Sequence, residues 1–211
     1  NVGIRKLNSA YAVGGGPLLV STIESNYRVD IDNYASVDFS SMANIIDLVG
    51  GVDLEVSTQE AGYINMYLDE QCRLQGLNAS DYYVTGGGIT HLNGNQAVGF
   101  ARIRYTSRGN EHSDYGRTSR QREILVQLMQ KARSLDATTL LAVVNNMLPL
   151  ITHNIDAATL TTLIANAPSY INYDIQTDRI PYDGLYSNLG EELVPDFEAT
   201  INRLHQTIYG N

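Results

Sequence analysis

The sequence predicts a layered α/β fold in a single domain spanning residues 1–211. Apolar and polar residues alternate at Tyr34–Phe39 and again at Val52–Val56, which is typical of half-buried strands. The apolar residues of Ile45–Val49 lie between them, and this β-α-β order favours helices packed against a sheet. The chain length, with 43% hydrophobic and 18% charged residues, is that of an ordinary globular domain.

Glycines and a proline set the boundaries of the first helices. We expect a short helix at Leu7–Val13, a break at Gly14–Pro17, and a second helix that continues to about Asn26, because proline suits a first helical position. The glycines could cradle a phosphate, but they lack the Lys and Ser/Thr of a P-loop, so a tight turn is favoured. Ser40 or Ser41 is the expected cap of the next helix.

The stretch at residues 59–88 is rich in Tyr, Asn, Gln and Gly, and we interpret it as a long excursion over the surface. After it, Asn93 and Gln96 have the spacing of a capping pair, which predicts a short helix over Gly94–Ala101.

The second half of the chain is predicted to be mainly helical. From Thr118 on, one apolar stripe repeats with helical spacing, formed by Ile124, Leu125, Leu128, Met129 and Ala132. We expect two further helices, one late strand and one closing helix, at residues 137–151, 157–170, 175–180 and 195–208. The apolar helices of residues 124–170 could line a lipid tunnel, although such stripes more often form a core.

Arginines are concentrated in one short segment. Six of the twelve arginines lie between Arg102 and Arg122, in a chain with a formal net charge of −9 and a pI near 4.8. The planar guanidinium suits bidentate contact with phosphate oxygens, so the segment predicts a site for a compact phosphate-bearing group. The acidic pI argues against a nucleic-acid partner, because binding a phosphate backbone requires a broad basic face.

Spacing within this segment predicts two opposed sets of side chains. In an extended chain, Arg102 and Arg104 would point to one face with their Cα atoms about 6.8 Å apart. Arg117 and Gln121 are four residues apart and would share a face at the start of a helix. Asp114 could orient one of the arginines through a carboxylate pair.

Simpler interpretations of these residues remain open. The arginines could pair only with surface carboxylates, and Thr118 with Gln121 fits a capping box that needs no substrate. Asp30, Asp32 and Asp38 could hold a cation, but their even spacing more often marks a solvated face. The single cysteine and the scattered histidines predict neither a disulfide nor a zinc site.

Four motifs, taken in order and spacing, resemble the LytR-CpsA-Psr family of cell-envelope proteins. They are KLNSAYAVGGG from Lys6, DNYASVDFSSMANIIDLVGGVDLEV from Asp32, HLNGNQAVGFARIRY from His91 and DYGRTSRQR from Asp114. The resemblance covers residues 4–134 and implies a three-layer α/β/α fold with a central mixed sheet. It also implies a polyprenyl-pyrophosphate lipid held by arginines and Mg²⁺, with its tail in a hydrophobic tunnel.

The resemblance implies a reaction and a set of site residues. A phosphoglycopolymer of the teichoic acid or capsule type would pass from its lipid carrier to peptidoglycan, as a hydroxyl attacks the phosphate next to the sugar. The implied catalytic residues are Arg102, Arg104, Asp114, Arg117 and Gln121. The implied substrate-binding residues are Lys6, Arg102, Arg104, Arg117, Arg120 and Gln121. The loop between Arg104 and Asp114 is longer than in many members of the family, which leaves the aim of Asp114 open.

The family's Mg²⁺ ligands lie N-terminal to the KLN segment, so we expect the metal ligands upstream of this chain. The resemblance also implies an extracytoplasmic protein on a Gram-positive-type cell surface, held by an upstream membrane anchor. No apolar run in this sequence reaches the roughly 18–20 residues that span a bilayer. Two alternatives are a non-catalytic binder of phosphorylated lipids or glycans and a transcriptional regulator. Against the regulator stands the lack of a basic recognition helix.

Overall fold

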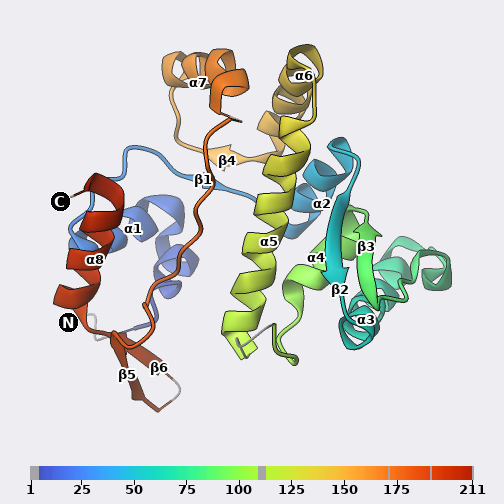
Figure 1. The fold of residues 1–211 in the computed structure, drawn as a ribbon, viewed down its shortest axis with the longest axis horizontal. Coiled ribbons are helices and arrows are strands. Elements are labelled where there is room, and N and C mark those ends of the chain that lie inside the picture. The colour runs from blue at the N-terminus through green and yellow to red at the C-terminus, as the bar shows by residue number, and fades with distance from the viewer. Residues whose placement is uncertain (1–4, 109–112, 171, 191, 211) are drawn as a thin grey trace. The chain divides into compact units, whose positions relative to one another are not determined.

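The computed structural model describes residues 5–108, 113–170, 172–190 and 192–210 (Figure 1). The chain divides into two compact units. Unit 1 comprises Asn1–Ser36, His153–Ile155 and Gln176–Asn211, and unit 2 comprises Val37–Thr152 and Asp156–Ile175. No helix of the described residues combines the length and apolar character needed to cross a membrane.

Unit 1 is built on two helices, α1 (Ser9–Tyr27) and α8 (Phe197–Tyr209). The expected break at the glycines is confirmed, because Gly14 and Gly15 have non-helical backbone angles inside α1. A Cβ on Gly16 would lie 2.3 Å from the ring of Tyr34, so close packing explains this glycine without a bound phosphate. The closing helix begins two residues later than expected, because Asp196 caps α8 by accepting from the N–H of Ala199.

The strands of unit 1 differ from the expectation. Residues 175–180 form no strand, and the pairing occurs later, between β5 (Tyr186–Leu189) and β6 (Glu192–Pro195). A strand is stable only where a partner lies beside it, which a single apolar run cannot reveal. The strand predicted at Tyr34–Phe39 is only two residues long, as β1 (Ala35–Ser36), and β4 (Thr152–His153) is equally short.

Unit 2 has an antiparallel pair at its centre, β2 (Val52–Val56) and β3 (Gly88–Leu92), in which Val52 lies opposite Leu92. The alternation predicted for β2 is confirmed, because Val52, Leu54 and Val56 are buried in the core. The preceding helix α2 (Phe39–Leu48) begins earlier than expected, because Asp38 rather than a serine caps it and accepts from the N–H of Ser41 at 2.7 Å.

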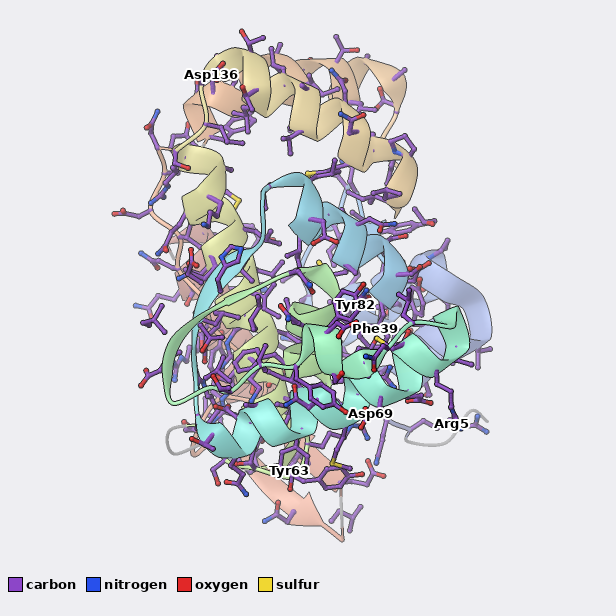
Figure 2. All side chains as sticks on the ribbon, turned by 90° about the vertical axis from the view of Figure 1, so that its right-hand side faces the viewer. Arg5, Phe39, Tyr63, Asp69, Tyr82 and Asp136 are labelled. Carbon is purple, nitrogen blue, oxygen red and sulfur yellow. The ribbon has the colours of Figure 1, made fainter. Side chains whose placement is uncertain are left out.

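The interpretation of residues 59–88 as a surface excursion was wrong. An 18-residue helix, α3 (Thr58–Gln75), occupies the first part, followed by a 3₁₀ turn at Ala79–Tyr82. Figure 2 looks onto this side of unit 2, with the labelled Tyr63 and Asp69 on α3. The buried apolar residues of α3 recur with helical spacing at Ala61, Ile64, Leu68 and Cys72. The polar composition obscured this stripe, since only one residue in each turn is apolar and buried.

The remaining helices of unit 2 follow the predictions more closely. The capping pair is confirmed in α4 (Gly94–Arg102), where Asn93 and Gln96 bond reciprocally. Helix α5 (Ser113–Arg133) begins before Thr118. It is followed by α6 (Ala137–Met147), a 3₁₀ turn (Leu148–Leu150) and α7 (Ala157–Tyr170). Figure 1 shows α3, α4 and α5 gathered around β2 and β3. Phe100 of α4 is fully buried in the core that these elements share.

Candidate functional site

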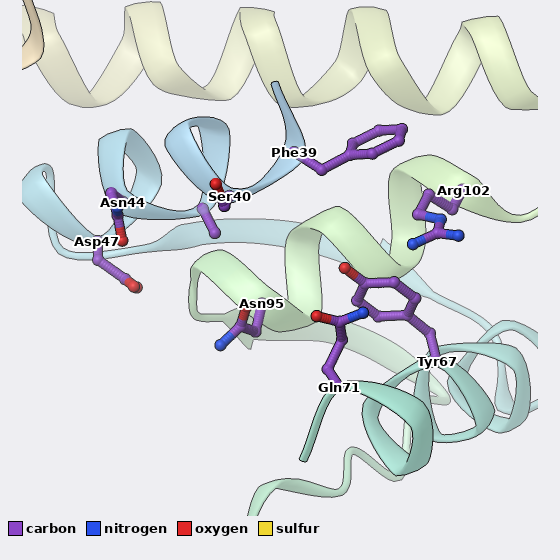
Figure 3. Close-up of a pocket in the computed structure, with 9 residues that line it drawn as sticks. Phe39, Ser40, Asn44, Asp47, Tyr67, Gln71, Asn95 and Arg102 are labelled. Atoms are coloured by element: carbon purple, nitrogen blue, oxygen red, sulfur yellow. The ribbon is translucent and has the colours of Figure 1, made fainter. Parts of the chain in front are cut away.

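Arg102 is the last residue of α4, and it is exposed at the surface of unit 2. Its guanidinium stacks on two aromatic rings, with its central carbon 5.2 Å from the centroid of Phe39 and 4.6 Å from that of Tyr67 (Figure 3). Stacking of this kind contributes about 0.5–1 kcal/mol at exposed sites and fixes the direction of the side chain. Arg102 therefore presents a positive charge whose position is set by α2 and α3.

A cleft of about 280 Å³ lies beside Arg102, between α2, α3 and α4. Its walls are formed by Phe39, Ser40, Ala43, Asn44, Asp47, Tyr67, Gln71, Asn95 and Arg102. At the end away from Arg102, the Asp47 carboxylate accepts the backbone N–H of Gly94 at 2.7 Å and so ties α2 to the start of α4. The cleft thus has a cation at one end and a carboxylate at the other.

Arg120 lies elsewhere than expected, because its side chain is fully buried inside unit 2 (0% exposed). Its Nε donates to the Glu60 carboxylate at 2.9 Å, and its terminal nitrogens donate to the carbonyls of Ile103, Thr106 and Ser107 at 3.1–3.3 Å. The expectation that Arg120 binds substrate is corrected here: it is a structural residue that holds the segment after α4 in place.

Arg108 is also neutralised within the protein. It donates to both oxygens of Glu123 and lies 3.3 Å from Glu60, while its guanidinium stacks on the ring of Phe100. Carboxylate pairing therefore occurs at Arg108 and Arg120, although the simpler interpretation expected surface carboxylates and the partner of Arg120 is a buried one. One of their partners, Glu60, is itself almost fully buried (2% exposed).

The helix α5 contributes the rest of the predicted set. Gln121 donates from its side-chain amide to the carbonyl of Ala101 at 3.5 Å, which places it against the end of α4. Thr118 donates to the carbonyl of Tyr115 inside α5, so the capping box proposed for Thr118 and Gln121 does not form. Arg117 is half-buried on the same helix, and Arg104 is exposed.

Two expected residues stand apart from this description. Asp114 is in the first turn of α5, but its side chain lies outside the described residues, as do residues 109–112 of the adjoining loop. Lys6 belongs to unit 1, where its Nζ lies 3.3 Å from the Glu192 carboxylate. The roles expected for Asp114 and Lys6 stay predictions.

Comparison with known proteins decides the family. The sequence model of the LytR_cpsA_psr family matches residues 2–204 of the 211. The chain belongs to this family. Its relatives include the polyisoprenyl-teichoic acid–peptidoglycan teichoic acid transferase TagV of Bacillus subtilis, 33% identical over 61% of this chain and 29% of the relative. The TagU transferase of Enterococcus faecalis is 31% identical over 67% of this chain and 42% of the relative.

The fold of this LytR-CpsA-Psr chain also matches solved structures. The structure described as TagT bound to LIIa-WTA superposes with a TM-score of 0.67 and 18% identity, over 98% of this chain and 72% of that one. The mixed α/β class expected from the sequence is confirmed by this likeness. The chain spans less than half the length of the two relatives named above.

The Mg²⁺ expected for a LytR-CpsA-Psr protein has no evident ligand set in this part of the chain. Within the described ranges, no three His, Cys, Asp or Glu side chains gather closely enough to hold a metal ion. The alternative of a cation at Asp30, Asp32 and Asp38 gains no support, since no such group gathers among the described residues and the Asp38 carboxylate instead caps α2 by accepting from the N–H of Ser41. The Mg²⁺ stays a prediction.

Sequence reasoning missed three residues of the site, Phe39, Tyr67 and Glu60. For Glu60 a signal was present, because Ser57 and Glu60 have capping-box spacing and do form that box. Tyr67 was hidden by the misreading of α3. Phe39 gave no signal, because nothing local shows that its ring lies beside an arginine 63 positions later.

The buried carboxylate makes the stability of this LytR-CpsA-Psr chain depend on acid. Burial alone would raise the pKa of Glu60, but hydrogen bonds from Ser57 and Arg120 and the charge of Arg108 outweigh it, so the pKa is lowered. The contribution of the Glu60 carboxylate to the free energy of unfolding is complete above the pKa of a glutamate in the unfolded chain, about 4.3. This contribution is lost as pH falls through the lower pKa of Glu60 in the folded protein.

We therefore expect the difference in free energy of unfolding between the wild type and Glu60→Gln to narrow as pH falls from about 6 to about 3. Urea titrations at several pH values measure it. A difference that stays constant over this range would show that folding does not lower the pKa of Glu60, and one that widens as pH falls would show that folding raises it.

Proposed function

We propose that this protein transfers a polyprenyl-pyrophosphate-linked glycopolymer, of the teichoic acid or capsule type, onto peptidoglycan at the cell surface. Supporting the proposal, relatives in the same family are named as polyisoprenyl-teichoic acid–peptidoglycan teichoic acid transferases. A protein of similar fold has been solved bound to LIIa-WTA. The membrane anchor and the extracytoplasmic location belong to the same proposal.

The observation that carries the proposal is how the arginines divide. Arg108 and Arg120 are neutralised by glutamates inside unit 2, whereas Arg102, the last residue of α4, is exposed and stacks on the rings of Phe39 and Tyr67. Arg120 and Gln121 donate to the carbonyls of Ile103 and Ala101, on either side of Arg102, and so fix the backbone from which Arg102 extends. An arginine held in this way is pre-organised for a phosphate group.

In the proposed reaction, Arg102 and Arg104 hold the pyrophosphate. A sugar hydroxyl of the acceptor loses its proton to water as its oxygen forms a bond to the phosphorus next to the glycopolymer. The bond from that phosphorus to the bridging oxygen breaks, and polyprenyl phosphate leaves. Negative charge develops on the phosphate oxygens, and fixed guanidinium groups stabilise it because they need not reorganise. Mg²⁺ is the expected cofactor and would supply further positive charge; Arg117 and Gln121 are proposed to lie on the acceptor side.

The test replaces Arg102 and Arg104 by Ala singly in the protein. Each charge-assisted hydrogen bond contributes about 1.5–3 kcal/mol, so affinity for a short-chain polyprenyl pyrophosphate should fall about 10- to 150-fold in each variant. Transfer to peptidoglycan, assayed with Mg²⁺, should fall with it. Arg73→Ala, which removes an exposed arginine at the end of α3, is the matched control.

The outcomes separate the candidate functions. Unchanged affinity in Arg102→Ala and Arg104→Ala would remove these residues from the site. Tight binding of the lipid without transfer would favour a non-catalytic binder instead of an enzyme. Binding to duplex DNA that weakens steeply with salt would favour a regulator.

A further inference from the structure

The cleft beside Arg102 has a fixed polarity. Helices α2 and α4 run antiparallel along it, because Phe39 meets Arg102 at one end and Asp47 accepts from Gly94 at the other. Phe39 and Asp47 are eight residues apart on α2, and Gly94 and Arg102 are eight residues apart on α4. This spacing corresponds to about 12 Å along each helix axis. Figure 3 shows Arg102 and Asp47 at opposite ends of the cleft. A ligand here would place an anionic group at Arg102 and neutral donors toward Asp47.

Three side-chain amides line the space between these ends. Asn44 comes from α2, Gln71 from α3 and Asn95 from α4 (Figure 3). In the described part of the chain, no hydrogen bond engages any of these amide groups. Each offers donors and an acceptor, which is the combination that binds hydroxyl groups, and the exposed ring of Phe39 provides an apolar surface beside them.

The size of the cleft limits the ligand. Its volume of about 280 Å³ is near the lower end of the range for small-molecule pockets, about 300–1,000 Å³. One sugar ring fits this description better than a segment of polymer. An aromatic face, several amides and a carboxylate together suit a ring with apolar C–H faces and hydroxyls at its edge.

We propose that this cleft is the subsite for the saccharide unit that carries the phosphate held by Arg102. This inference rests on the proposed function for the identity of the phosphate, and it adds a specificity site for the donor. Gln71 and Asn95 bind hydroxyl or acetamido groups of the ring, and Asp47 accepts from a hydroxyl at the far end. The carboxylate also disfavours a second phosphate there.

The experiment measures binding by calorimetry or NMR titration to the 211-residue chain. The probes are an N-acetylhexosamine 1-phosphate, the same sugar without phosphate, and inorganic phosphate. Gln71→Ala and Asn95→Ala should each lower the affinity for the sugar phosphate about 3- to 10-fold, which is the effect of one lost hydrogen bond. The affinity for inorganic phosphate should not change. Gln130→Ala, an exposed amide on α5 outside the cleft, is the control. Circular dichroism verifies the fold of each variant.

Wild-type affinity for the sugar phosphate in both Gln71→Ala and Asn95→Ala would overturn the subsite. The sugar in the cleft could come from the lipid-linked donor or from the peptidoglycan acceptor, and competition experiments separate the two. A donor-derived glycosyl phosphate should displace the probe, and a phosphate-free peptidoglycan disaccharide should not. Equal competition by the disaccharide would overturn the assignment to the donor. Sugar phosphate binding in the cleft without any transfer to peptidoglycan would contradict the proposed reaction and support the subsite. Transfer that is unchanged in both Gln71→Ala and Asn95→Ala would support the proposed reaction and contradict the subsite.

Discussion

Replacing Glu60 by Gln is expected to lower the free energy of unfolding by about 3–5 kcal/mol, because it leaves the buried guanidinium of Arg120 without a compensating charge. The loss is large because Glu60 has three tasks: it closes the capping box with Ser57, pairs with Arg120 and attracts Arg108. Urea denaturation followed by circular dichroism measures the change. Glu70→Gln, an exposed carboxylate on the same helix, should change stability by less than about 0.5 kcal/mol.

A double variant separates charge from packing. Glu60→Leu combined with Arg120→Met removes both charges, and a well-packed apolar pair often costs little relative to a buried ion pair. We therefore expect the double variant to be more stable than Glu60→Gln. It should nevertheless lose affinity for the lipid pyrophosphate, since the carbonyls around Arg102 are no longer held. A loss in Glu60→Gln below about 1 kcal/mol would contradict the role assigned to this network.

Replacing Gly94 by Ala is expected to force α2 and α4 apart. A Cβ at this position would lie 2.0 Å from the carbonyl oxygen of Ala43 and 2.5 Å from its carbon, and both are backbone atoms that cannot rotate away. We expect a loss of about 3 kcal/mol, at the upper end of the range for overpacking. The cleft between the two helices should change shape, so sugar phosphate affinity should fall as well.

Gly62→Ala is the matched control for this prediction. Gly62 lies inside α3, and a Cβ there would meet nothing within 4 Å. Because glycine in a helix interior is destabilising relative to alanine, this substitution should stabilise the protein by about 0.5–1 kcal/mol. Equal stability of Gly94→Ala and Gly62→Ala in thermal unfolding would show that α2 and α4 are not closely packed at this point.

Local sequence signals predicted the elements that depend on neighbours in the chain. The capping pair of α4, the glycine break in α1 and the alternation of β2 were readable because each involves residues a few positions apart. Helix α3 was misread although its capping box was present, because its apolar stripe is one residue wide and its composition resembles a loop. The strand expected at 175–180 failed for the opposite reason, since pairing needs a partner that no local pattern supplies.

In the arginine segment, neighbouring residues do not determine which side chains are buried and which are exposed. The spacing of its motifs was sufficient to indicate the family, which is confirmed, and its concentration of charge in an acidic chain predicts a phosphate site, which stays a prediction. Which arginines face solvent depended on contacts across long separations: Glu60 reaches Arg120 over 60 positions, and Phe39 reaches Arg102 over 63. The sequence alone determines how many arginines lie in this segment and how they are spaced. Their roles are decided only in the tertiary structure, because a guanidinium beside a buried carboxylate stabilises the fold and an exposed guanidinium can bind a ligand.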